Sequence, residues 1–356
     1  MLGNARRTVL TVSLLLASIL AFPPAAVAQQ KPPDPAVREG VALHDKGEFD
    51  KAIEKFEEAL KRDPNDMVAL YEMANTYWAK KDYKKVLELG ARGLQSSKGC
   101  QSGDFYMVIA NAQDEVGEGD AAIETFKAGI RECPTQGALH YNLAIAYINK
   151  NQIDLAREAL KRDVTLRPTH SSGHFYLARI YEAQGYKVPA VLAYGWFLIL
   201  EPDTARSKAA LASLDRLFKM GYDKNPSTGQ VTLTVSAIAK KDEGDFGAAE
   251  LTMLVAEAVP EVQDRVSGAP DSVVKKLQAV LMLLGRMKET GPGFASEFYL
   301  PYYAGLVEHS HVEAFAHAVM FAGGQPEVKD WIAKNQPALK ALVTWSKAFP
   351  WPSPKL

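Results

Sequence analysis

Small residues recur between residues 40 and 212 with a period close to 34 residues. This column consists of Gly40, Ala74, Ala110, Ala144, Ala178 and Ala212, so its spacings are 34, 36, 34, 34 and 34. A second column has the same spacings over its span and consists of Ala52, Val86, Ala122, Ala156 and Ala190. Columns that share one period indicate a repeat architecture, in which each unit packs mainly against its neighbours.

Each unit has the pattern of two helices joined by a short turn. Ala52, Phe56 and Ala59 are spaced to lie on one helical face, where small residues allow close approach and the aromatic ring fills space. A further column closes the units, because proline fits the first turn of a helix but not its interior. That column consists of Pro64, Lys98, Pro134, Pro168 and Pro202, and the turns between paired helices contain Gly47, Gly117 and Gly185.

The period and these columns resemble tetratricopeptide repeats over about residues 33–204, with a sixth first helix at about 205–220. The resemblance implies an all-α, right-handed solenoid of about five helix pairs plus an extra helix, with a concave groove that binds peptides or protein segments. The second unit departs from the pattern at Gly90, Gly93 and Lys98, and two extra residues follow it. We therefore expect looser packing and a local change of superhelical pitch there.

The resemblance also implies which surface binds a partner, because the first helix of each unit lines the concave side. Tyr71, Asn75 and Trp78 lie at i, i+4 and i+7, so they share one helix face. Aromatic side chains are good anchors, and amides can donate to and accept from an extended backbone. The alternative is that some of these positions pack against neighbouring helices. The predicted groove residues are Tyr71, Asn75, Trp78, Met107, Asn111, Tyr141, Ile145, Phe175 and Arg179.

Some members of this family bind a chain-terminal carboxylate with Lys and Asn side chains in the groove. The first row of predicted groove positions consists of Val37, Tyr71, Met107, Tyr141 and Phe175, and it contains no Lys or Arg. The sequence therefore does not support carboxylate recognition of that kind.

Two cysteines lie in the third unit. Cys100 precedes its first helix and Cys133 ends its second helix, so antiparallel packing brings the two positions close together. We expect a Cys100–Cys133 disulfide, with two separate thiols as the alternative.

The first 28 residues have the pattern of a secretory signal peptide. Arg6 and Arg7 are followed by an apolar run from Val9 to Phe22, and Ala26-Val27-Ala28 offers a cleavage site before Gln29. We therefore expect export to the periplasm or the medium, with an uncleaved membrane anchor or twin-arginine export as alternatives. After cleavage we expect no stable membrane span. Lys and Arg total 41 against 42 Asp and Glu, which gives no bulk charge for binding nucleic acid.

Residues 1–28, 29–220 and 221–356 are thus predicted to be signal peptide, repeat solenoid and a mostly helical C-terminal region of unknown type. Residues 222–230 read as a loop or linker, and Val231, Leu233 and Val235 alternate as in a short strand or an extended segment. Helices are expected at 246–257, 272–287 and 297–322, and two more begin at Pro326 and Pro337, with Trp331 and Trp345 as core candidates. This region would cap the solenoid.

No catalytic motif is present, and no cofactor is expected. We therefore predict a non-enzymatic scaffold with a protein or peptide partner. One alternative is a metal-binding or metal-dependent enzymatic C-terminal domain, because His309, Glu313 and His317 lie at i, i+4 and i+8 of an expected helix. The other alternative is a structural protein of the cell envelope that self-associates through its apolar C-terminal half.

Overall fold

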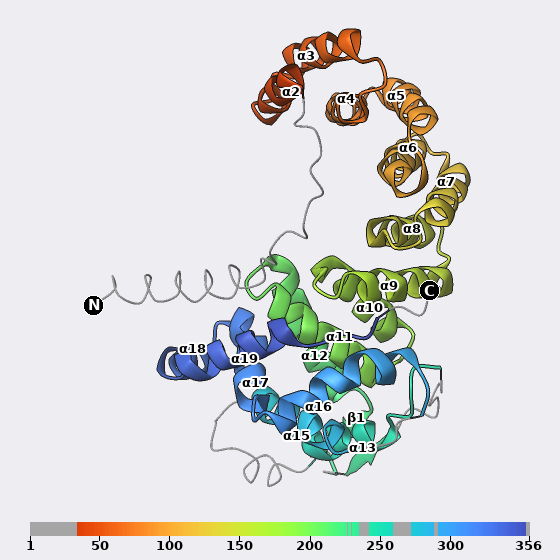
Figure 1. The fold of residues 1–356 in the computed structure, drawn as a ribbon. Coiled ribbons are helices and arrows are strands. Elements are labelled where there is room, and N and C mark those ends of the chain that lie inside the picture. Colours follow the sequence, from red (N-terminus) through yellow and green to blue (C-terminus); the bar gives the residue numbers. More distant parts are fainter. Residues whose placement is uncertain are drawn as a thin grey trace. The chain divides into compact units, whose positions relative to one another are not determined.

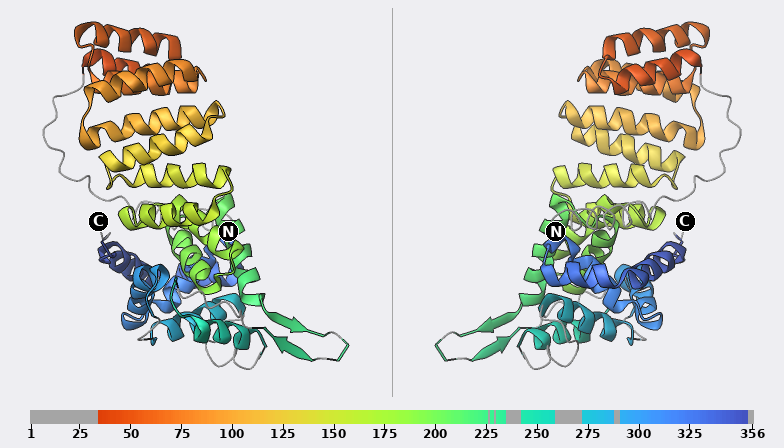
Figure 2. Two further views of the ribbon diagram at one scale, coloured as in Figure 1. Left: turned by 90° about the vertical axis from the view of Figure 1, so that its right-hand side faces the viewer. Right: turned by 90° about the vertical axis from the view of Figure 1, so that its left-hand side faces the viewer.

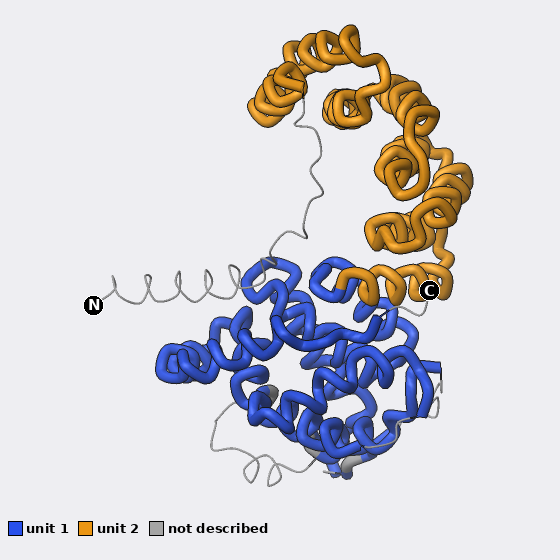
Figure 3. The backbone as a smooth tube through the Cα atoms, in the orientation of Figure 1, with its two compact units in different colours: residues 1–22, 168–353 blue, residues 23–167, 354–356 orange. Residues whose placement is uncertain are grey.

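The computed structural model describes residues 34–225, 227–228, 230–234, 242–258, 272–287 and 291–353. These residues belong to two compact units, one of residues 34–167 and one of residues 168–353 (Figure 3). The predicted signal peptide, residues 1–28, lies outside the described residues. Within the ranges given above, no helix is both long enough and apolar enough to cross a bilayer.

The described part of the unit of residues 34–167 consists of antiparallel helix pairs stacked in successive layers (Figure 2). Its first helices are α2 (Pro35–Asp45), α4 (Met67–Ala79), α6 (Gly103–Glu115) and α8 (Gly137–Asn149). Its second helices are α3 (Phe49–Arg62), α5 (Tyr83–Ser96), α7 (Gly119–Glu132) and α9 (Ile153–Leu166). The predicted all-α solenoid of helix pairs is confirmed.

The small-residue columns form the contacts inside the pairs. Ala52, Ala74 and Ala122 are fully buried, and so is the ring of Phe56. A Cβ atom on Gly40 would lie 2.5 Å from Phe56 Cε1, so the ring occupies the space that the glycine leaves. The close approach of paired helices therefore depends on residues without bulk at these positions.

The second helix pair is tightly packed, so the expectation of looser packing there was wrong. Gly90 and Gly93 are buried, and the side chains of the next first helix fill the space beside them. A Cβ on Gly90 would lie 2.5 Å from Ile109 Cγ1, and one on Gly93 would lie 2.1 Å from Phe105 Cε1. The glycines permit a close approach of α5 to α6 and do not leave a void.

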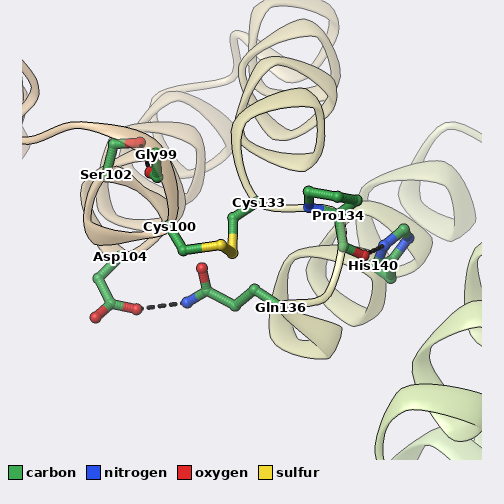
Figure 4. Close-up of a disulfide and its surroundings, with 8 residues drawn as sticks. All are labelled: Gly99, Cys100, Ser102, Asp104, Cys133, Pro134, Gln136 and His140. Carbon is green, nitrogen blue, oxygen red and sulfur yellow. Dashed lines mark hydrogen bonds between the residues drawn. A yellow bond between two sulfur atoms is a disulfide. The ribbon is translucent and has the colours of Figure 1, made fainter. Parts of the chain in front are cut away.

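The extra residues after the second pair form η1, a short 3₁₀ helix (Gly99–Ser102) that precedes α6. Cys100 in η1 and Cys133 after α7 form the predicted disulfide, with their Cα atoms 4.5 Å apart (Figure 4). Beside it, Gln136 Nε2 donates to Asp104 Oδ1 at 2.6 Å. The bridge and this hydrogen bond fix the start of α6 against the end of α7 and the start of α8.

The unit of residues 168–353 begins with a further helix pair that is built into a larger helical body. Its helix α11 is buried from Val188 to Ile199, as expected for a helix that is apolar on all sides. This helix contacts α10, α12, α13, α17 and the π-helical turn η2. The elements are α10 (Ser171–Ala183), α11 (Lys187–Leu200), α12 (Ala205–Lys219), α13 (Gly247–Ala258), α15 (Ser272–Leu284), η2 (Ala295–Tyr299), α16 (Leu300–Glu308), α17 (Val312–Val319), η3 (Met320–Gly323), α18 (Pro326–Lys334) and α19 (Gln336–Ala348).

A short hairpin belongs to the same unit. β1 (Tyr222–Lys224) pairs in antiparallel fashion with β2 (Val231–Leu233), with Tyr222 opposite Leu233. The expectation of a loop at 222–230 was therefore wrong for the first three residues. They gain strand structure from a partner segment that follows them in the sequence.

The expectation of a single helix at 297–322 was also wrong. A turn at residues 309–311 separates α16 from α17, and Ser310 in it has a φ of 58°. His311 N donates to Leu306 O at 2.7 Å, in the same pattern by which Tyr186 N donates to Tyr181 O between α10 and α11. The turn is thus of the kind that joins the paired helices of the repeats. The helices that begin at Pro326 and near Pro337 are confirmed, although Trp331 and Trp345 are only half-buried.

A buried histidine connects the first helix of this unit to the C-terminal part. His174 in α10 is fully buried, with Nε2 2.9 Å from Pro168 O and Nδ1 2.7 Å from Tyr299 Oη. Because a carbonyl oxygen only accepts, Nε2 carries the proton and Nδ1 accepts from the Tyr299 hydroxyl. Burial lowers the pKa of His174 to about 3, so the ring is neutral at pH 7.

Candidate functional site

The first helices of the unit of residues 34–167 form one continuous surface. Helix α2 contacts α4, α4 contacts α6, and α6 contacts α8, whereas the second helices contact one another less. Within this unit the first helices therefore lie on the inside of the curve and the second helices on the outside (Figure 1). We call the surface of α2, α4, α6 and α8 the inner face.

Two aromatic side chains of the inner face are held in fixed orientations by neighbouring rings. Tyr71 and Trp78 are half-buried and pack on the core of their unit. The Tyr71 ring lies edge-on to Phe105, with centroids 6.2 Å apart, and the Trp78 ring lies edge-on to Tyr83 at 5.2 Å. Both rings expose part of their surface without needing to change position, which lowers the entropy that a partner must remove on binding.

The amide of Asn75 lies beside these rings. Burial raises the pKa of the Tyr71 hydroxyl, and a hydrogen bond with Asn75 opposes that shift. Burial likewise raises the pKa of Glu72, and Asn75 and His44 oppose the increase. The middle of α4 thus combines an aromatic ring, an amide and a carboxylate that are all partly exposed.

The remaining predicted groove residues of this unit are also partly exposed on first helices. They are Met107 and Asn111 on α6, and Tyr141 and Ile145 on α8. Asn142 Nδ2 donates to Met107 Sδ at 3.5 Å, which joins the two helices at the level of this row. Seven of the nine predicted residues therefore lie on the inner face.

The other two predicted residues, Phe175 and Arg179, belong to α10 in the unit of residues 168–353. Phe175 is 9% exposed, and its ring packs 4.9 Å from Phe197 and under the guanidinium of Arg206. Its surroundings are those of a core residue, with little surface left for a partner. Arg179 is exposed.

Carboxylates on the inner face form a feature that no sequence motif indicated. Glu72 lies on α4, and Asp104, Asp114 and Glu115 lie on α6. One feature of the sequence does point to these carboxylates: α4, α6 and α8 contain no Lys and no Arg.

A pocket of about 310 Å³ lies elsewhere in this unit, among α3, α4 and α5. Leu60, Met73 and Leu89 line its apolar part, and charged residues of both signs, such as Glu57 and Lys85, line the rest. Lys85 Nζ lies 2.9 Å from Glu88, so part of this charge is paired within the pocket wall. The pocket shows no preference for one kind of charge.

The histidines considered as metal ligands are held by carbonyl groups and aromatic rings. The turn at 309–311 separates His309 from α17, so His309, Glu313 and His317 do not share one helix. The His317 ring stacks on Trp331 with centroids 4.0 Å apart, and Trp331 Nε1 donates to Glu313 at 3.0 Å. Among the described residues, no three His, Cys, Asp or Glu side chains gather in a way that could hold a metal ion.

Solved structures of other proteins, two of them described as TPR proteins, resemble part of the chain. TTC0263, a thermophilic TPR protein of Thermus thermophilus, is 26% identical and its match covers 50% of this chain and 97% of its own, with a TM-score of 0.41. PilF of Pseudomonas aeruginosa is 18% identical over 52% of this chain and 82% of its own, with a TM-score of 0.46. YrrB, a TPR protein with an unusual peptide-binding site, is 15% identical over 58% and 97%, with a TM-score of 0.38. No curated protein matches the sequence.

Two family models match the sequence directly. A model described as TPR repeat matches residues 40–81, which contain most of α2, all of α3 and all of α4. A second model, described as tetratricopeptide repeat, matches residues 138–170, which contain most of α8 and all of α9. Residues 40–81 and 138–170 therefore match the tetratricopeptide repeat in sequence.

Proposed function

We propose that this protein is a non-enzymatic scaffold that captures a polypeptide segment on the inner face. The observation that carries the proposal is the row formed by Tyr71, Met107 and Tyr141. These side chains come from three successive first helices, and each is partly exposed. Large side chains that are already oriented can bind apolar groups of a partner with a small loss of entropy.

The amides beside this row supply the polar contacts that an extended chain needs. Asn75 and Asn111 occupy equivalent places one turn beyond Tyr71 and Met107, and both are partly exposed. Each amide can donate to a carbonyl group and accept from an N–H group of a bound backbone. Apolar contacts would give affinity, and the amides would fix the direction and register of the bound segment.

We further propose that the protein is exported and that residues 29–220 act as the binding solenoid, with 221–356 as its C-terminal region. The N-terminal residue pattern supports export. The Cys100–Cys133 disulfide is compatible with it, because such bonds persist mainly in oxidising compartments. Fractionation of the native host, with sequencing of the mature N-terminus, tests this proposal. Recovery of the full-length chain from the cytoplasm would contradict it.

The test of binding is chemical crosslinking of the full chain in the native host, followed by mass spectrometry. The variant Tyr71→Ala, Trp78→Ala, Tyr141→Ala removes three rings of the inner face and should abolish crosslinks between α4, α6 or α8 and a partner. Leu155→Ala is the matched control, because Leu155 lies on the second helix α9 and is 49% exposed. Circular dichroism checks that both variants remain folded. Unchanged crosslinks in the folded triple variant would refute the proposal.

A further inference from the structure

Charge is divided between the two layers of helices in the unit of residues 34–167. Every Lys and Arg that lies within helices α3 to α9 belongs to a second helix. The first helices α4, α6 and α8 have no such cation, and their acidic groups are Glu72, Asp104, Asp114 and Glu115. The inner face is therefore anionic on α4 and α6 and has neither Lys, Arg, Asp nor Glu on α8, although the whole chain is almost neutral.

The carboxylates of the inner face bind neutral donors. Gln136 Nε2 donates to Asp104 at 2.6 Å, and Asn149 Nδ2 donates to Asp114 at 3.0 Å. Tyr83 Oη donates to Glu115 at 3.2 Å. Over the described part of the chain, neither these three groups nor Glu72 forms an ion pair, so their charge is not compensated by the protein.

The lysines that directly follow α4 and α8 pair with acids of second helices. Lys80 and Lys150 follow the last residues of α4 and α8, where they could in principle reach inward. Instead Lys80 pairs with Asp50, and Lys150 Nζ lies 2.8 Å from Asp120. Both acids lie in the first turn of a second helix. These pairs hold the ammonium groups of Lys80 and Lys150 against second helices.

The carboxylates lie next to the apolar row. Glu72 is adjacent to Tyr71 in the sequence, and the charge of Asp104 on the neighbouring helix contributes to the raised pKa of the Tyr71 hydroxyl. Asp104 precedes Met107 by three residues on α6, so the two lie on neighbouring positions of one helix face. Apolar and negative groups thus lie next to one another on α4 and α6.

We propose that the segment captured on the inner face is positively charged, an extended stretch of a partner protein in which Lys or Arg side chains alternate with apolar ones. This inference rests on the proposed function and names the chemistry of the partner. The apolar side chains contact Tyr71, Met107 and Tyr141, and the cations contact the uncompensated carboxylates. Complementary charge also speeds association and selects against acidic segments, which the carboxylates of α4 and α6 repel.

The half-buried position of Glu72 adds to this selectivity. Burial raises its pKa because the charged form loses contact with water. A cation that approaches Glu72 offsets part of the hydration energy that this carboxylate loses on burial. Dissolved salt screens this attraction less than it screens the attraction at an exposed carboxylate. Glu72 is therefore the carboxylate whose interaction with a bound Lys or Arg should persist best in salt.

The experiment uses fluorescently labelled synthetic peptides and the full mature chain, with binding followed by fluorescence anisotropy. One peptide alternates Lys with apolar residues, a second has Glu at every Lys position, and a third has Ser there. The Lys peptide should bind about tenfold or more tightly than the Glu peptide, since opposite charge attracts and like charge repels. Its affinity should fall when NaCl rises from about 50 to about 500 mM, because the exposed carboxylates are screened.

Two variants with equal change of net charge separate local from general electrostatics. Glu72→Gln, Asp104→Asn, Asp114→Asn neutralises three of the four carboxylates of α4 and α6 and keeps a hydrogen-bonding oxygen in each side chain. Glu54→Gln, Glu57→Gln, Glu132→Gln neutralises three exposed groups of second helices. The first variant should weaken binding of the Lys peptide about tenfold, and the second should change it less than about twofold. Equal weakening by both variants would overturn the inference.

The Tyr71→Ala, Trp78→Ala, Tyr141→Ala variant separates the inference about the charge of the segment from the proposal that the inner face captures a segment. Suppose that the Ser or Glu peptide binds as well as the Lys peptide and only the aromatic variant abolishes binding. The inference about charge is then overturned and the proposed function stands. If no peptide binds in a way that depends on either set of residues, both are overturned.

Discussion

Loss of the Cys100–Cys133 disulfide should destabilise the third helix pair more than any other part of the protein. The bridge joins residues 33 apart in the sequence, from η1 to the end of α7. A closed loop of that length restricts the unfolded chain by about 12.5 cal/mol/K, which corresponds to about 3.7 kcal/mol at 25 °C. Because each pair of a solenoid interacts mainly with its neighbours, the loss should be concentrated in α6 and α7.

Hydrogen exchange with mass spectrometry measures this effect helix by helix. A loss of about 3.7 kcal/mol corresponds to exchange of the protected amides roughly 400-fold faster. The comparison is between the oxidised protein, the protein treated with a reducing agent, and the Cys100→Ala, Cys133→Ala variant. Alanine suits position 133 because Cys133 is 3% exposed, and serine would bury a hydroxyl group there.

Helices α2 and α3 serve as the internal reference, because they belong to the first helix pair and the bridge lies in the third. The reduced protein and the double variant should agree, since both lack the same constraint. The reasoning is refuted if reduction changes exchange in α6 and α7 by less than about threefold. It is refuted equally if α2 and α3 respond as strongly as α6 and α7.

Two further predictions concern packing and pH. Gly93→Ala should lower the free energy of unfolding by about 1–3 kcal/mol despite better helix propensity, since its Cβ would lie 2.1 Å from Phe105 Cε1. Gly119→Ala is the control in urea unfolding, because the atom nearest to its added Cβ, Lys150 Cδ, would lie at 3.4 Å. Its free energy of unfolding should fall less than that of Gly93→Ala. The unit of residues 168–353 should lose stability as pH falls from about 6.5 towards 3, because His174 takes up a proton readily only when unfolded. The free energy of unfolding, measured against pH, should fall less steeply in His174→Gln, by up to about 1.4 kcal/mol per pH unit. Parallel curves of unfolding free energy against pH for the two proteins would contradict this.

The repeat illustrates what a sequence pattern can establish. The columns headed by Gly40 and Ala52 predict which faces of the paired helices meet, and the structure buries every member of both columns except Ala212, which is exposed. The same periodicity places Cys100 and Cys133 at facing ends of two helices, which was enough to predict their disulfide. Both follow from the geometry of one repeating unit, without knowledge of the rest of the fold.

The glycines of α5 illustrate where such reasoning fails. Gly90 and Gly93 lack side chains, and a sequence does not distinguish a void from a close approach by a neighbour. The structure shows a close approach, because Ile109 and Phe105 of the next helix fill the space. The identity of that neighbour, and its orientation, depend on how consecutive pairs stack.

The sequence by itself determined the helical repeat, the first and second helix of each pair, and the absence of cations from α4, α6 and α8. These features are local, because they depend on residue spacing within about one repeat. Only the tertiary structure decided that α11 packs against α17 and η2, that His174 accepts a hydrogen bond from Tyr299, and that the predicted helix at 297–322 breaks at Ser310. Those outcomes depend on contacts between segments that are distant in the sequence or on a left-handed turn at a residue that is not glycine, and residue spacing specifies neither.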